Sequence, residues 1–363
     1  MLELRHNGRP YTLWESATFG RSLDSNCGQF SFTSSNPISP EYPLRKGDRI
    51  QCIVNGRPVI TGFIERISAS GDINGHRLNI QGRDKVCDLI DSSVPDAAKT
   101  ISGPISLKAL AERVIAALGA SIKVIDNSGG IEQFTASDLQ AATSGQKCMD
   151  FLVSFARKRQ VYLITNGDGD LVIFRPQGQK SATPLLHRPD EPNNNVKSAS
   201  LELDDTVRFG SYAVRTQNNV ASDPFAGYDA SAVSITGQST DDEIRASRYL
   251  EIQAEESMTA AECAERANEE SNLRRAKGLL YRATLVGDSQ VNGSPWDIGS
   301  LVDVFDDYNG ARGELLMFEI NTTVDLSQGS LTEVGCSPAD AYRAVRKSRR
   351  TKRKSKQDPF AGF

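Results

Sequence analysis

The chain has 363 residues, of which 38% are hydrophobic and 24% are charged. This composition is that of ordinary globular domains and excludes wholesale disorder, while the length predicts two or three domains. No apolar run approaches the roughly 18–20 residues of a membrane span, and the first residues contain no long apolar stretch of the secretory kind. We therefore expect a protein that is made and kept in the cytosol.

The charges are distributed unevenly along the chain. The formal net charge is −4, yet nine Lys or Arg and no acid fall between residues 341 and 357. The remainder holds 46 acids against 33 bases, a net −13, so the body is acidic and the tail is basic. The six cysteines lie far apart, without the short spacings of zinc sites or disulfide frameworks. We expect them to be small buried apolar residues.

Strand patterns separated by turns occupy the first part of the chain. Asn55-Gly56 lies between the strand-like runs Gln51–Val54 and Val59–Ile67. This dipeptide between two such runs is a strong signal for a two-residue hairpin. We predict a first, β-barrel-like domain over residues 1–95.

Helical and strand patterns are mixed over residues 96–185. Apolar residues recur at helical spacing between Ser106 and Gly119, where glycine suits the left-handed end of a helix, and again over about Gln146–Arg159. Two strand-like runs then enclose the polar segment Asn166–Asp170, which is typical of a hairpin loop. We predict an α+β domain here.

Residues 186–340 again favour strands, and we predict a second β-barrel-like domain with a mobile loop at 217–242. That loop is rich in Ser, Asn, Gly and Asp and poor in large apolar residues. One helix is expected from Thr259, where Thr259 and Glu262 form a capping-box pattern. Residues 341–363 are predicted to be a basic, flexible C-terminal tail. The fold class is therefore α+β and β-rich, with two small β-barrel-like domains and an α+β segment between them.

The sequence lacks recognisable catalytic chemistry. Its three histidines stand beside no nucleophile motif, and no P-loop, G-x-S-x-G or H-E-x-x-H pattern occurs. The segment Asn166–Asp170 has alternating oxygens but lacks the glycine spacing and distal glutamate of an EF-hand loop. We expect no enzyme, no metal, no cofactor and no small-molecule substrate.

Two features of the sequence leave alternatives open. The basic run Arg343–Lys356 suits a docking arm for an acidic partner, a nucleic-acid contact, or a simple solvated tail. Its lack of aromatic residues weakens the reading as a single-strand binder. The peptide Asp223-Pro-Phe-Ala-Gly227 recurs as Asp358-Pro-Phe-Ala-Gly362. Chance explains this repeat, and so does a peptide that docks into one kind of pocket from two places.

Three motifs carry a family resemblance. They are Tyr42–Ile50, Thr61–Ile67 and Gln81–Asp91, and Trp296–Gly299 extends the likeness. Together they resemble the hub proteins of contractile phage tails, in particular the baseplate hubs of Mu-like phages and prophages related to the late control protein D group. The signature residues, which we expect to be structural, are Gly47, Asp48, Thr61, Gly62, Gly82, Arg83, Asp84, Asp88, Leu89, Asp91, Trp296 and Gly299.

The resemblance implies a structural virion protein. It implies a homotrimer in which each chain supplies two similar β-barrels, so that a ring of six joins the hexameric tail tube to a trimeric spike around a DNA channel. DNA would pass without specific binding, the host membrane would be contacted only through the assembled tail, and assembly would take place in the bacterial cytoplasm. The alternatives are a tail-associated peptidoglycan-degrading enzyme and a spike component of a contractile secretion system.

Two local hypotheses follow for individual residues. We expect Gly82 to relieve a tight turn, and Asp84 or Asp88 to cap a short helix after it. In the tail, the residues expected to dock onto a neighbouring tail or baseplate protein are Arg346, Lys347, Arg349, Arg350, Phe360 and Phe363.

Overall fold

The computed structural model describes residues 2–35, 44–72, 75–135, 139–159, 161–176, 179–218, 233–254 and 259–342. The chain divides into two compact units. The first consists of Met1–Leu203 and Leu279–Ala344, and the described part of the second is Asp204–Gly278. The second unit is therefore an insertion into the first.

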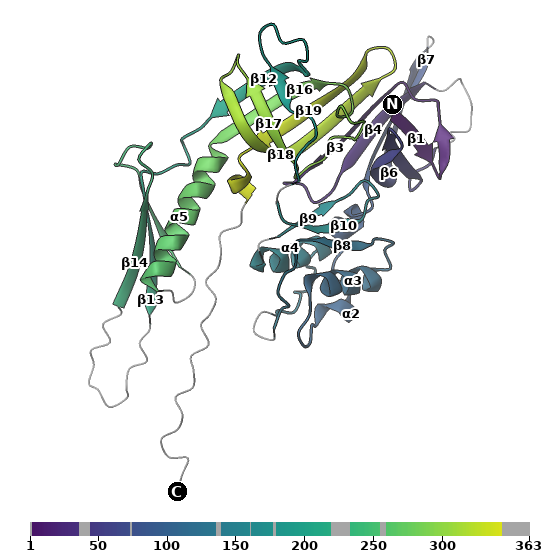
Figure 1. The fold of residues 1–363 in the computed structure, drawn as a ribbon. Coiled ribbons are helices and arrows are strands. Elements are labelled where there is room, and N and C mark those ends of the chain that lie inside the picture. Colours follow the sequence, from purple (N-terminus) through teal and green to yellow (C-terminus); the bar gives the residue numbers. More distant parts are fainter. Residues whose placement is uncertain are drawn as a thin grey trace. The chain divides into compact units, whose positions relative to one another are not determined.

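Thirteen strands of the first unit form one sheet (Figure 1). Its N-terminal half contains β1 (Leu2–His6), β2 (Arg9–Tyr11), β3 (Ser16–Ser22), β4 (Gln29–Ser35), β5 (Arg49–Val54), β6 (Arg57–Asp72) and β7 (Gly75–Asp84). Its C-terminal half contains β11 (Leu185–His187), β12 (Val196–Leu203), β16 (Leu279–Val286), β17 (Leu301–Asp306), β18 (Ala311–Asp325) and β19 (Gly329–Ser337), followed by the 3₁₀ turn η1 (Ala339–Tyr342). The order is β12-β16-β19-β18-β3-β4-β7-β6-β5-β1-β2, with β17 beside β18 and β11 beside β17.

The two halves are joined by strand pairing. The first part of β18 pairs with β17, and its second part pairs antiparallel with β3, where Ile320 lies opposite Arg21. The β-rich class is confirmed, but the expectation of two barrels needs correction. Because β18 runs on past the end of β17, its free backbone groups find their partners in β3. Both halves therefore belong to a single sheet, and the described strands of neither half form a closed barrel.

Each half of the sheet nevertheless packs around its own apolar cluster. The N-terminal cluster includes Phe30, Phe32, Ile50 and Ile80, and the C-terminal cluster includes Tyr281, Trp296, Val302 and Leu316. The hairpin predicted at Asn55-Gly56 is confirmed, since both residues have positive φ, 50° and 78°. This is the backbone shape that a two-residue turn between twisted strands requires.

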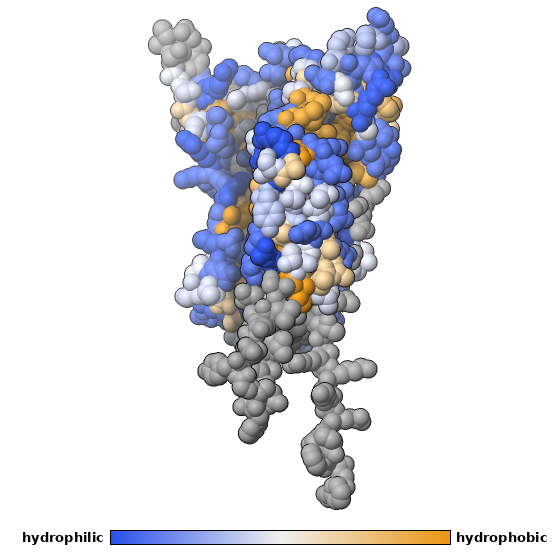
Figure 2. Space-filling view, turned by 90° about the vertical axis from the view of Figure 1, so that its left-hand side faces the viewer, coloured by the Kyte–Doolittle hydropathy of each residue, from blue (hydrophilic) through white to orange (hydrophobic). Residues whose placement is uncertain are grey.

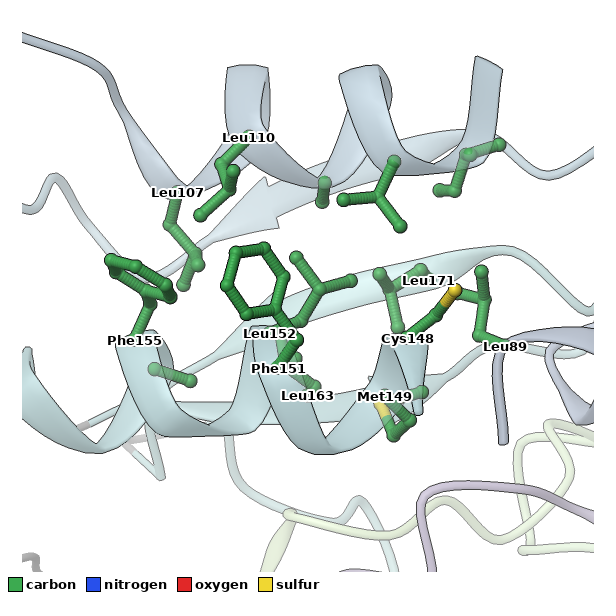
Figure 3. Close-up of a cluster of buried hydrophobic side chains, with 14 of the residues drawn as sticks. Leu89, Leu107, Leu110, Cys148, Met149, Phe151, Leu152, Phe155, Leu163 and Leu171 are labelled. Atoms are coloured by element: carbon green, nitrogen blue, oxygen red, sulfur yellow. The ribbon is translucent and has the colours of Figure 1, made fainter. Parts of the chain in front are cut away.

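The helical segment lies between the two halves in sequence. It contains α1 (Cys87–Asp91), α2 (Asp96–Lys99), α3 (Leu107–Leu118), β8 (Val124–Asn127), α4 (Cys148–Lys158), β9 (Tyr162–Thr165) and β10 (Leu171–Phe174), and its strands are ordered β8-β10-β9. The Ser106 hydroxyl accepts the Ala109 N–H and Gly119 ends α3 with φ 77°, as predicted. Figure 3 shows the apolar side chains of α3 and α4 pointing toward one another, with Leu163 and Leu171 of the strands beside them.

The two halves of the large sheet share one topology. In the N-terminal half, β3 to β7 follow one another in the chain and lie in the order β3-β4-β7-β6-β5; in the C-terminal half, β12 and β16 to β19 lie in the order β12-β16-β19-β18-β17. Both long strands carry a bulge at the same place, between Ile64 and Arg66 in β6 and between Met317 and Glu319 in β18. The Gly47 N–H donates to the Ile64 carbonyl, and the Gly299 N–H donates to the Met317 carbonyl in the same way. The first unit therefore contains an internal structural repeat.

The second unit is a three-stranded sheet with one helix. Strands β13 (Ser211–Asn218), β14 (Val233–Thr240) and β15 (Tyr249–Gln253) lie in the order β14-β13-β15, and α5 (Ala260–Lys277) packs on β13 and β14. The capping box of Thr259 and Glu262 is confirmed. The mobile loop expected at 217–242 is corrected in part, because residues 233–240 form β14. Ladder bonds to β13 hold this strand although it has few apolar residues, and residues 219–232 lie outside the described residues.

An ion-pair cluster around the buried Asp241 ties the second unit together. Asp241, which has no exposed side-chain surface, accepts bonds from Arg208 and Arg275, and Glu243 pairs with Arg208 as well. Burial by itself would raise the pKa of the Asp241 carboxyl, but the bonds from Arg275 and Arg208 outweigh it and hold this pKa below its ordinary value. The charged form is therefore the one that the fold stabilises.

The surface in view is mostly polar. Figure 2 shows one face of the molecule, on which hydrophilic residues predominate and apolar residues form small, separate groups. The large apolar side chains that are exposed include Leu13, Leu203, Val286, Val291, Tyr308 and Leu326. Among the described residues, no helix has the length and apolar character needed to cross a membrane.

Replacing Asp241 by Asn should destabilise the second unit by about 3 kcal/mol at pH 7, because Arg208 then loses the one of its three carboxylate partners that is buried. The depressed pKa of Asp241 means that its contribution is present above the unfolded-state value near 4 and is lost as the pH falls through the folded-state value. The difference in the free energy of unfolding between the wild type and the variant should thus become smaller at acidic pH. Urea unfolding followed by circular dichroism across pH 3–7 measures it, with Asp242→Asn at the exposed neighbouring position as the control. Equal losses for both variants would contradict the role of the cluster.

Candidate functional site

Most of the signature residues gather where β7 passes into α1, at the junction between the large sheet and the helical segment. Strand β7 ends at Asp84 and α1 begins at Cys87, so the residues in between connect the two parts of the first unit. Two of the three motifs, Thr61–Ile67 and Gln81–Asp91, meet here because β6 and β7 are paired. This junction is the candidate functional site.

Asp84 is the buried centre of the junction. Its Oδ2 accepts the Gly28 N–H at 2.5 Å, and its Oδ1 accepts the Val86 N–H at 3.0 Å and the Cys27 thiol at 3.2 Å. Burial raises the pKa of this carboxyl, although the bonds from Gly28 and Thr165 oppose the rise. A single side chain thus satisfies backbone groups from the connection between β3 and β4 and from the start of α1.

Arg83 joins the bulge of β6 to α1. Its guanidinium bonds Glu65 through Nε at 2.8 Å and Nη2 at 2.6 Å, and bonds Asp91 through Nη2 at 2.5 Å. Bonds to Glu65 and then to Asp91 raise the pKa of Arg83, while Arg83 lowers the pKa of Asp91. This fork geometry is one that lysine cannot supply.

The expectations of a tight turn at Gly82 and of a helix cap at Asp84 or Asp88 are both wrong. The N-cap position of α1 is Val86 and no side chain caps the helix, so neither Asp84 nor Asp88 plays that part. Asp88 is exposed, and partial desolvation of its carboxyl together with the nearby charges of Asp91 and Glu65 raises its pKa. Gly82 lies inside β7 rather than in a turn, and a Cβ there would overlap the Phe63 carbonyl and the Phe30 ring. Glycine is required for close approach and not for a left-handed turn.

The hairpin loop Asn166–Asp170 packs against β6. The Thr61 hydroxyl donates to the Gly167 carbonyl at 2.8 Å, and Lys85 Nζ lies 2.7 Å from Asp170 Oδ1. A Cβ at Gly62 would overlap the Arg83 carbonyl, which explains a glycine at that position. The loop is therefore a structural contact, and among the described residues no cluster of His, Cys, Asp and Glu could hold a metal ion.

The remaining signature residues lie elsewhere. Gly47 (φ 86°) and Gly299 (φ 79°) occupy equivalent turns before β5 and β17, and Asp48 accepts the Arg45 N–H at 2.7 Å and bonds His6 at 2.8 Å. Leu89 is buried in the core of the helical segment, and Trp296 is buried in the C-terminal cluster. The six tail residues Arg346, Lys347, Arg349, Arg350, Phe360 and Phe363 lie outside the described residues, as do both copies of the Asp-Pro-Phe-Ala-Gly peptide.

One arginine at the junction is not among the signature residues predicted from the sequence. Arg21 of β3 donates to the Thr165 carbonyl at 2.9 Å and to Asp297 at 2.8 Å, which links both halves of the sheet to the helical segment. No sequence signal marks it, because its partners lie far away along the chain. These side chains fill space, pair charges or bond backbone groups, and together they connect the large sheet to the helical segment.

Comparison with known proteins shows which families the two parts of this junction are similar to. Residues 1–84 match the family described as Mu phage baseplate assembly protein GpP-like, N-terminal, and residues 86–175 match the baseplate hub protein gp44-like, second domain. The chain is 25% identical over 358 residues to the baseplate hub protein gp44 of Escherichia phage Mu, covering 97% of this chain and 91% of the relative. Residues 1–175 are thus similar to domains of Mu-type baseplate assembly and baseplate hub proteins, and the similarity to the hub protein extends over nearly the whole chain.

Two solved structures of phage tail proteins share the fold. The 43 kDa tail protein of prophage MuSo2 from Shewanella oneidensis has a TM-score of 0.76 and 27% identity, over 94% of this chain and 98% of that one. The tail protein from Neisseria meningitidis MC58 has a TM-score of 0.73 over 95% of this chain and 98% of that one, and at 17% identity it shows the fold alone. The two family matches meet between residues 84 and 86, at the joint around Asp84. The role of this hub protein in the baseplate is structural.

Replacing Asp84 by Ala should lower the free energy of unfolding by about 3 kcal/mol, because two buried N–H groups, of Gly28 and Val86, lose their acceptor. Asp88→Ala is the matched control four residues away, and it should change stability by no more than about 0.5 kcal/mol because the side chain is exposed and caps nothing. Chemical denaturation of both variants measures the difference. A larger loss for Asp88→Ala would restore the capping role that the geometry contradicts.

Proposed function

We propose that this hub is a homotrimer that joins the hexameric tail tube to a trimeric spike around a channel for DNA. The observation that supports this is the internal repeat of the large sheet. A chain with two similar halves places six similar halves in a ring of three chains, and so can match a sixfold neighbour on one side while remaining threefold itself. Closed rotational symmetry is required, because an open head-to-tail contact would make fibres.

The charge of the protein supports passage of DNA without binding. Outside residues 341–357 the chain carries a net −13, and a wall with that excess of carboxylates repels phosphates rather than holding them. In this proposal the host membrane is contacted only through the assembled tail, and the trimer assembles in the bacterial cytoplasm before it enters the virion. Docking of the basic tail onto a neighbouring baseplate protein stays a prediction from the sequence.

The oligomeric state tests the proposal directly. Light scattering on the full-length protein after size exclusion should give three times the monomer mass across micromolar concentrations. A monomer or a dimer over that range would count against the trimeric hub.

We also propose that the protein has no enzymatic activity of its own, since the joint contains no nucleophile or general base set in a cleft. Purified hub should therefore leave peptidoglycan intact in a zymogram in which lysozyme clears the gel. Clearing by the hub would favour the alternative of a tail-associated cell-wall hydrolase.

Retention of duplex DNA by the hub at physiological salt would contradict the proposed passage of DNA without binding.

A further inference from the structure

A groove crosses one face of the C-terminal half of the large sheet. It has a volume of about 330 Å³ and is lined by residues of β12, β16, β19 and β18. Because side chains alternate between the two faces of a sheet, the recorded pairings place one row of lining residues across these strands. The row is Ser200, Arg282, Gly335 and Glu319, and Glu333 lies in the next row. The groove is therefore on the face turned away from the C-terminal apolar cluster.

The groove is acidic. Its basic lining residue, Arg282, is already paired with Glu319 at 2.8 Å. Glu333 is exposed, and so is Glu202, which lies two residues beyond Ser200 on the same face of β12. Neither of these two carboxylates forms an ion pair with a described residue. A surface with such an excess of negative charge attracts a basic segment and repels phosphates.

The last described residue, Tyr342, lies beside this groove. Its ring stacks on the Phe318 ring with 5.7 Å between the centroids, and the Arg282 guanidinium lies 6.0 Å from the centroid of the same ring. The Phe318 ring occupies the groove side of Gly335, since a Cβ at Gly335 would come within 2.7 Å of the ring. Residue 343 therefore starts on the face of the sheet that carries the groove.

Tyr342 is fixed in this position by several contacts. Its hydroxyl donates to Asp24 Oδ2 at 3.1 Å, and its ring lies 6.0 Å from the Tyr162 ring. Burial raises the pKa of the Tyr342 hydroxyl, and the charges of Asp24 and Glu319 add to the rise. The basic tail thus begins at a fixed point with carboxylates nearby.

We propose that the basic tail lies across this groove in its own chain, with Lys and Arg side chains against Glu202, Glu319 and Glu333. The tail contains nine Lys or Arg before its first acid, Asp358. Four paired strands are about 14 Å wide, a width that about five extended residues span. Since the tail is attached beside the groove, its effective concentration there is high, and individually weak surface ion pairs are sufficient. The inference does not depend on the proposed trimer.

A tail held in this way changes how the protein meets its partners. While the tail covers the groove, the carboxylates of the groove neutralise part of its positive charge. A neighbouring baseplate protein that takes up the tail must then compete with the groove and offer a more acidic surface. Nucleic acid is a poor competitor for the groove itself, because carboxylates repel phosphates. The groove is therefore a holding site that restrains the tail before assembly.

Carbodiimide cross-linking of the full-length protein tests the contact, because this reagent joins a lysine amine directly to a carboxylate. At about 50 mM salt, where screening is weak, Lys347 and Lys352 should form amides with Glu333 or Glu202. Mass spectrometry should detect these amides in the band of single-chain mass on a denaturing gel. At about 500 mM salt the yield should fall several-fold, because exposed ion pairs are then screened.

Tryptic cleavage provides a second measurement, because trypsin cuts the tail only when it has left the groove. Glu333→Gln should speed the loss of the tail about threefold, since one exposed charge contributes a factor of that order. The matched control is Asp242→Asn, which makes the same change of net charge at an exposed position of the second unit. It should leave the rate of cleavage unchanged.

The outcomes that overturn the contact are distinct. Amides of the tail lysines with carboxylates outside the groove alone, or only in bands of two or more chains, would contradict a contact within one chain. So would the lack of any tail amide in a sample in which Lys180 and Asp303, 2.8 Å apart, have been joined. Equal rates of tryptic loss for Glu333→Gln and the wild type also overturn it. Light scattering measures the trimer separately, so that its failure is not mistaken for the failure of this contact.

Discussion

The pairing of β18 with β3 is the interaction on which the rest of the first unit depends. It brings together strands from opposite ends of the chain, with Thr322 opposite Phe19 and Ile320 opposite Arg21. Without it the two halves of the sheet would be separate domains, each with an unpaired long edge. The two strands are far apart in the sequence, so bringing them together costs the entropy of closing a long loop before their pairing can stabilise the fold. Folding of the N-terminal strands is therefore coupled to folding of the C-terminal strands.

Close approach of backbones at this pairing and at the joint explains several glycines. A Cβ at Gly20 would overlap the Asn321 side chain across the β3–β18 ladder, and one at Gly62 or Gly82 would overlap the carbonyl of Arg83 or Phe63 across the β6–β7 ladder. These glycines have extended backbone rather than the left-handed conformation. Their role is to leave room where the backbones and side chains of neighbouring strands approach closely.

Patterns set by neighbouring residues were predictable, and distant pairings were not. The hairpin at Asn55-Gly56, the helix between Ser106 and Gly119 and the capping box at Thr259 depend on chemistry within a few residues, so their sequences predict them. The role of Asp84 depends on the Gly28 N–H, 56 residues away, and a local reading could only interpret this carboxylate as a helix cap. The ladder of β14 was overlooked for the same reason, because β13 supplies the bonds and the strand itself offers little apolar pattern.

The repeat accommodates its insertion at one hairpin. Residues 23–28 connect β3 to β4, and at the equivalent place the whole second unit connects β12 to β16. The insertion begins and ends at a paired position, since Leu203 lies opposite Leu279 and the Asp204 N–H donates to the Gly278 carbonyl at 2.7 Å. The pairing of β12 with β16 therefore continues up to the inserted unit. Inserting that unit at the hairpin adds little entropic cost beyond the cost of folding the unit itself. In the proposed ring the two kinds of half would alternate: the strands common to both present six similar positions, while the inserted units present three. The proposed contact with a sixfold tube and a threefold spike would need this combination, and a difference at one hairpin between otherwise equivalent halves is sufficient to produce it.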